Sequence, residues 1–97
     1  MATGVGTTEI DFGAHPGVNE ASVAVTGQTG ITTGSHVEAW VMGDDTTTDH
    51  TASDHKYFPA LASLVCGTPT AGVGFTIYGR SVHKLTGKFA VHYVWST

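Results

Sequence analysis

The sequence contains few of the residues on which small proteins often rely for cross-linking or catalysis. Its 97 residues include one cysteine, Cys66, and only 12% are charged. A single cysteine cannot form an internal disulfide, whereas small secreted domains usually carry several paired cysteines. Cys66 ends an apolar segment, residues 60–66, so we expect a buried and unreactive thiol. We therefore expect the chain to fold in a reducing cytoplasm.

Basic residues and long apolar runs are also scarce. Four Lys and Arg stand against eight Asp and Glu, a net charge of −4, whereas nucleic-acid binding needs clustered bases. The first six residues contain neither the basic nor the apolar segment of a signal peptide. No apolar run approaches the ~20 residues of a membrane span. We therefore expect no nucleic-acid partner and no membrane.

What the chain does contain is typical of β-structure. It has 13 Gly and 16 Thr, and Thr, Val and aromatic residues favour strands while Gly favours turns. Six segments alternate or are continuously apolar, and no segment of helical length keeps a 3.6-residue period. The six expected strands are Thr7–Gly13, Glu20–Gly27, Ser35–Gly43, Phe58–Cys66, Val73–Arg80 and Gly87–Trp95. This pattern predicts one all-β domain over residues 1–97: an antiparallel β-sandwich of about six to seven strands, Ig-like or jelly-roll-like.

The outward faces of two expected strands carry residues that are common at protein interfaces. Trp40 and Met42 alternate with inward residues on one strand, and Tyr78 does so on another. We predict these three as apolar anchors of an interface, with a polar rim of Glu38, Arg80 and Lys88. The alternative is that one strand faces the other way and Trp40 and Met42 belong to the core, since a one-residue register change reverses every side chain.

The charges are segregated along the chain. All eight carboxylates precede residue 55, and all four Lys and Arg follow it. An acidic first half and a basic second half would steer copies of the chain toward one another. Alternatively, a β fold interleaves the two halves and the asymmetry disappears.

The most polar segment, residues 43–57, is also the longest connection, and long loops in compact domains are usually functional or mobile. We predict that it contacts a neighbouring subunit through Asp45, Asp49, His50, Asp54 and His55. The repeated Asp-His pair suggests zinc ligands, but on a helix positions five apart lie about 140° apart, so we predict no metal and no cofactor. A short helical turn from Ala52 to His55, capped by Thr48 or Asp49, is an equally good interpretation.

Catalytic motifs are weaker still. The chain contains no Gly-x-Ser-x-Gly elbow, and Gly4-x-Gly6 and Gly72-x-Gly74 are too short for phosphate-binding loops. We therefore predict a non-enzymatic protein.

Several segments together resemble small virion structural proteins of tailed bacteriophages and prophages. These segments are residues 10–13, 20–28, 37–40, 49–55, 74–78 and 94–95. The resemblance implies a capsid decoration or cement protein that bridges capsid subunits, or a tail-associated β-sandwich, folded and assembled in the host bacterial cytoplasm. It implies capsid or tail subunits as partners, and it transfers no functional residue. The opposed charges and the outward faces separately predict a homo-oligomer such as a trimer.

Two other classes of function remain open at this stage. A tail- or fibre-associated module could bind carbohydrate on a host surface by stacking Trp40, Tyr57 and Tyr78 on sugar rings. A small metal-dependent enzyme could use the histidines and aspartates of residues 43–57.

Overall fold

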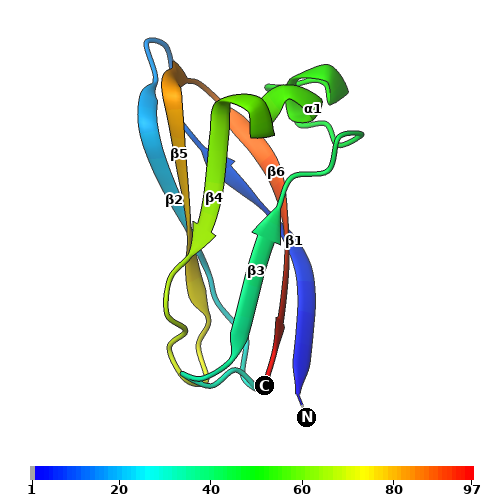
Figure 1. The fold of residues 1–97 in the computed structure, drawn as a ribbon, viewed down its shortest axis with the longest axis vertical. Helices are drawn as coiled ribbons and strands as arrows, with labels where there is room; N and C mark the ends of the chain where they lie inside the picture. Colours follow the sequence, from blue (N-terminus) through cyan, green and yellow to red (C-terminus); the bar gives the residue numbers. More distant parts are fainter. Residues whose placement is uncertain (1) are drawn as a thin grey trace.

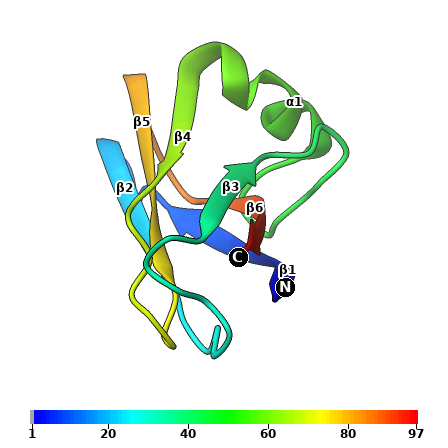
Figure 2. The ribbon, with the colours of Figure 1, turned by 60° about the horizontal axis from the view of Figure 1, so that its bottom comes forward.

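The computed structural model describes residues 2–97, and about half of them lie in six β-strands (Figure 1). The elements in chain order are β1 (Thr3–Asp11), β2 (Val18–Val25), β3 (His36–Trp40), α1 (Ala52–Leu61), β4 (Ala62–Cys66), β5 (Phe75–Leu85) and β6 (Lys88–Ser96). They form two antiparallel three-stranded sheets with the orders β1-β6-β3 and β2-β5-β4. In Figure 2 these two sheets lie on opposite sides of the molecule. The prediction of an all-β fold is therefore confirmed, apart from one helix.

Both sheets contribute to one hydrophobic core. Ile10, Ile77 and Val91 are fully inaccessible there, as expected of inward residues, whereas Val73, also expected to point inward, is exposed. The cluster of buried side chains consists of Ile10, Phe12, Val25, Ile31, Phe58, Phe75, Ile77, Phe89, Val91, Tyr93 and Trp95. Phe89, Val91, Tyr93 and Trp95 alternate along β6, as the period of two predicted.

The strand predicted over Phe58–Cys66 is wrong in its first half, and the helix is longer than the short turn over Ala52–His55 that the sequence offered as an interpretation. Residues 52–61 form α1, and only Ala62–Cys66 is a strand. The helix begins with a capping box, in which Thr51 and Asp54 each accept a hydrogen bond from the other's backbone N–H. Its buried residues are His55 and Phe58. Because His55 is polar, the apolar residues alone do not show the 3.6-residue period of this helix.

The inward face of β1 is built from small residues. Gly4 and Gly6 lie against the rings of Trp95 and Tyr93, and a Cβ atom at either position would overlap the ring. The Gly4-x-Gly6 motif, which is too short for a phosphate-binding loop, therefore has a packing role. It lets the backbone of β1 approach two large aromatic side chains of β6.

The charge segregation along the sequence does not survive folding. Arg80 on β5 pairs with Glu20 on the adjacent β2 at 3.3 Å, and Lys88 on β6 lies opposite Asp11 on β1. Each of the two sheets places a basic strand from the end of the chain beside an acidic strand from its beginning. The fold thus interleaves the two halves, which was the alternative to self-steering by opposed charge.

Candidate functional site

Trp40 and Met42 lie on the outward side of β3 and beyond its end, where 38% of Trp40 and 48% of Met42 are exposed. The Trp40 indole N–H donates to the Met42 sulfur at 3.2 Å. The indole also stacks on the His92 ring, with centroids 6.2 Å apart and an interplanar angle of 16°. The alternative that these two residues belong to the core is wrong. They form an exposed pair that is already held in position.

The surface around this pair belongs to β6 and β1. His92 lies between Trp40 and Thr7 in the strand register, and its Nε2 is hydrogen-bonded to the Asp45 carboxylate. In the next row, Val94 lies between Glu38 and the exposed Val5. We call this surface the β3–β6 surface and define it by Val5, Glu38, Trp40, Met42, His92 and Val94.

The structure separates the other predicted interface residues from this surface. Tyr78 and Arg80 lie on the outward face of the second sheet, where Tyr78 is opposite Ser22 and Val65. Arg80 is occupied there by its ion pair with Glu20. Lys88 lies at the beginning of β6, four residues before His92, and does not belong to the β3–β6 surface. The six predicted residues therefore do not form one patch.

The polar segment before α1 completes a sheet edge. β3 pairs with β6 only from His92 onward, so the first part of β6 lacks a strand on that side. Side chains take the place of the missing strand: Thr47 Oγ1 donates to the Lys88 carbonyl at 2.6 Å, and Asp49 accepts from the Lys88 N–H at 2.9 Å. His55 Nε2 accepts from the Ala90 N–H, also at 2.9 Å. An open strand edge is a site of unwanted pairing, and these residues cover it.

His55 is the centre of this arrangement and is completely buried. Because a backbone N–H can only donate, Nε2 must be the unprotonated ring nitrogen. Nδ1 then carries the proton and donates to the Thr51 carbonyl at 2.9 Å. The ring also meets the edge of Phe89 at a centroid distance of 5.4 Å. His55 therefore joins the first turn of α1 to the first part of β6.

His50 lies beside it and is also used internally. Its ring stacks on Phe89 with centroids 3.8 Å apart, and its nitrogens face the Asp54 carboxylate and the Thr86 carbonyl. Hydrogen bonds from the Thr51 backbone N–H and then from His50 lower the pKa of Asp54 below its ordinary value. Asp54 thus serves both the helix cap and the orientation of His50.

The five loop residues predicted to contact a neighbouring subunit all have partners within the chain. The expected helical turn is confirmed as the start of a longer helix, but its cap is Thr51 and not Thr48 or Asp49. Within residues 2–97, no group of three or more His, Cys, Asp or Glu side chains is placed to hold a metal ion. Sequence reasoning missed His92 and the edge-covering role of His55, since both depend on partners 35 or more residues away.

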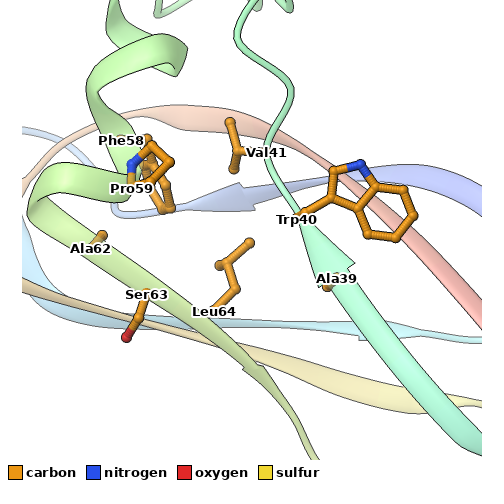
Figure 3. Close-up of a pocket in the computed structure, with 8 residues that line it drawn as sticks. All are labelled: Ala39, Trp40, Val41, Phe58, Pro59, Ala62, Ser63 and Leu64. Carbon is orange, nitrogen blue, oxygen red and sulfur yellow. The ribbon is translucent and has the colours of Figure 1, made fainter.

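A cavity of about 310 Å³ opens where β3, β4 and the end of α1 meet. Figure 3 shows Val41 and Leu64 facing each other across it, while the Trp40 indole turns away. Cys66 lies farther along β4, and burial, with a smaller contribution from Glu38, raises the pKa of its thiol. The thiol therefore stays protonated near neutral pH, as expected for an unreactive cysteine, but Cys66 is half-buried and not buried as predicted.

Comparison of the chain with protein-family models, curated proteins and solved structures finds no match. In the part of the chain that the structure describes, no helix is long and apolar enough to cross a membrane.

Proposed function

We propose that the chain is a non-enzymatic structural component of a tailed-phage virion, a capsid decoration protein that bridges neighbouring capsid subunits. The observation that carries the proposal is the exposed Trp40–Met42 pair on the β3–β6 surface. Large apolar side chains exposed together mark contact sites, and Trp and Met are enriched in them. The sequence resemblance to virion proteins supplies the location.

The way in which Trp40 is held supports a role as an anchor. Met42 fixes the indole N–H, and His92, itself bonded to Asp45, supports one face of the ring. A side chain that is ordered before binding loses less conformational entropy in the complex. Buried aromatic anchors of this kind carry most of the binding energy in protein interfaces.

We also propose that the two sheets form an Ig-like sandwich and not a jelly roll. Immunoglobulin constant-type domains place strands A-B-E-D in one sheet and C-F-G in the other. The orders β2-β5-β4 and β3-β6-β1 correspond to B-E-D and C-F-G, with β1 in the position of strand G. The connections agree, because β2 to β3, β3 to β4 and β5 to β6 each change sheet, whereas β4 to β5 does not.

The geometry favours this assembly role over carbohydrate binding. A sugar platform would need its aromatic rings on one surface, yet Trp40 and Tyr78 lie on the outward faces of different sheets, and Tyr57 lies on α1. His92 also covers one face of the Trp40 indole. The three aromatic residues therefore do not form a single stacking surface.

The test is to purify virions from a phage or prophage that encodes the chain and to quantify the chain against the major capsid protein by mass spectrometry. We expect a fixed ratio to the capsid protein, and we expect Trp40→Ala to remove the chain from the particles. Tyr57→Ala, which truncates an exposed aromatic residue on α1, is the matched control and should leave the ratio unchanged. Absence of the wild-type chain from purified virions would refute the proposal, and normal incorporation of Trp40→Ala would refute the anchor.

A further inference from the structure

The N-terminal strand β1 is attached to the rest of the molecule in an unusual way. It is an edge strand and pairs with β6 over its whole length, from Thr3 opposite Ser96 to Asp11 opposite Lys88. Of its inward residues, only Ile10 is large and fully buried. The strand is therefore held mainly by backbone hydrogen bonds and by the contact of Gly4 and Gly6 with aromatic rings.

The position that β1 occupies is selective for its own sequence. Trp95 and Tyr93 fill the space that side chains at positions 4 and 6 of the strand would need. The Trp95 indole cannot turn aside freely, because its N–H donates to the Gln28 side chain at 2.9 Å and the ring is 4% exposed. A side chain at position 4 or 6 of a strand paired with β6 in this register would therefore require Trp95 or Tyr93 to move, so Gly is favoured at both positions. The β1 strand of a second copy carries both glycines.

The connection to the rest of the chain allows β1 to be supplied by another copy. It passes from one sheet to the other through residues 12–17, which lie outside both strands. Gly13 and Gly17 adopt φ angles of +85° and +79°, and Gly13 is exposed with open space around its Cα. Phe12 is buried in the core, and the backbones of Phe12 and Gly13 bond to Gly87, so these two residues would move together with β1. Residues 14–16 are exposed, so the chain can follow a second path there without losing a contact of the core.

We propose that β1 exchanges between two copies of the chain, so that each copy's β1 pairs with β6 of its partner. Reciprocal exchange regenerates every hydrogen bond and ring contact that β1 makes within one copy. The two forms then differ only in the connection over residues 14–17 and in the entropy of association, which makes exchange an accessible route to a dimer. The proposal goes beyond the capsid role and does not depend on it, since exchange is a property of the chain alone.

The first test cross-links the strand to its partner in the full-length chain. Val5 lies opposite Val94 on the outward face of the β1–β6 pair, at a separation that a disulfide can span. Tagged Val5→Cys and untagged Val94→Cys chains, both with Cys66→Ala, are mixed at high concentration, incubated and oxidised. We expect a mixed dimer in which mass spectrometry identifies the 5–94 disulfide. The control mixes Val5→Cys with Val65→Cys, since Val65 is more exposed than Val94 but lies on the other sheet.

The second test uses the length of the connection. Deleting residues 14–16 should prevent β1 from reaching its own β6, so light scattering should give twice the mass of the chain. Inserting three glycines after Gly13 should leave the mass distribution of the wild type. A 5–94 yield no greater than that of the control mixture, or a folded monomer after the deletion, would overturn the proposal. If the deleted chain does not fold, the cross-linking result decides alone. Neither readout involves virions, so failure of the capsid role would leave this result unchanged.

Discussion

Removing the His55 side chain should destabilise the protein more than any change in an exposed histidine. His55→Ala leaves the buried Ala90 N–H without an acceptor and removes the bond to the Thr51 carbonyl. An orphaned buried donor costs about 1–3 kcal/mol, and loss of a buried ring adds a term for the cavity beside Phe89. We expect the free energy of unfolding to fall by about 3 kcal/mol, which corresponds to a decrease in Tm of roughly 12–24 °C for a chain of this size.

The assay is urea and thermal unfolding, followed by the fluorescence of the buried Trp95. His83→Ala is the matched control, because His83 is exposed on β5 and its truncation should change stability by less than about 0.5 kcal/mol. Two further variants separate the hydrogen bond from the packing. His55→Phe keeps the ring volume but cannot accept from Ala90, whereas the amide oxygen of His55→Gln can accept this bond.

We expect His55→Gln to be more stable than His55→Ala, and His55→Phe to remain well below the wild type. If His55→Phe unfolds within about 0.5 kcal/mol of the wild type, the bond to the Ala90 N–H contributes nothing, because a lost buried acceptor should cost about 1–3 kcal/mol. The interpretation of the polar segment as a cover for the β6 edge would then be wrong.

Three further predictions concern stability, pH and the thiol. Gly4→Ala should lower the free energy of unfolding by about 1–3 kcal/mol, because the added methyl group meets the Trp95 indole. Gly34→Ala is the control, since its methyl group enters open space. Equal effects of the two substitutions in thermal unfolding would contradict the packing role of Gly4. Because the pKa of Asp54 is lowered in the folded state, its carboxylate stabilises the fold above pH 3.8, the ordinary pKa of the group. This stabilisation is lost as the pH falls through the lower pKa of the folded state. Asp54→Asn should therefore flatten the stability profile below pH 3.8, and an unchanged slope would exclude this contribution. Because burial raises the pKa of Cys66, an aromatic disulfide reagent at pH 8 should modify the folded chain more slowly than the urea-unfolded chain. Equal rates would contradict the protection of this thiol in the folded state.

The sequence predicted the strands best where the evidence is local. Alternation of side chains between two faces is a property of each strand by itself, so Phe89, Val91, Tyr93 and Trp95 could be assigned to the core before any pairing was known. The same alternation correctly placed Trp40 and Met42 outside it. The second half of the helix was missed for a local reason as well, since its buried pair consists of His55 and Phe58, and His55 does not count as apolar.

The candidate site depended on strand order, which no local pattern contains. Trp40 and Tyr78 both face outward, but β3 and β5 belong to different sheets, so the predicted single interface divides into two surfaces. The mixing of acidic and basic halves has the same origin, because β6 lies between β1 and β3.

Composition and periodicity by themselves determined that this chain is mostly β, which faces of its strands are buried, and that residues 43–57 are polar. Only the tertiary structure decided what that polar segment does, because β3 ends at Trp40 and leaves the backbone of Lys88 and Ala90 without a neighbouring strand. Asp49 and His55 supply the missing acceptors from 39 and 35 residues away. A buried backbone donor must have a partner, and which side chain provides it depends on where the whole chain places that edge.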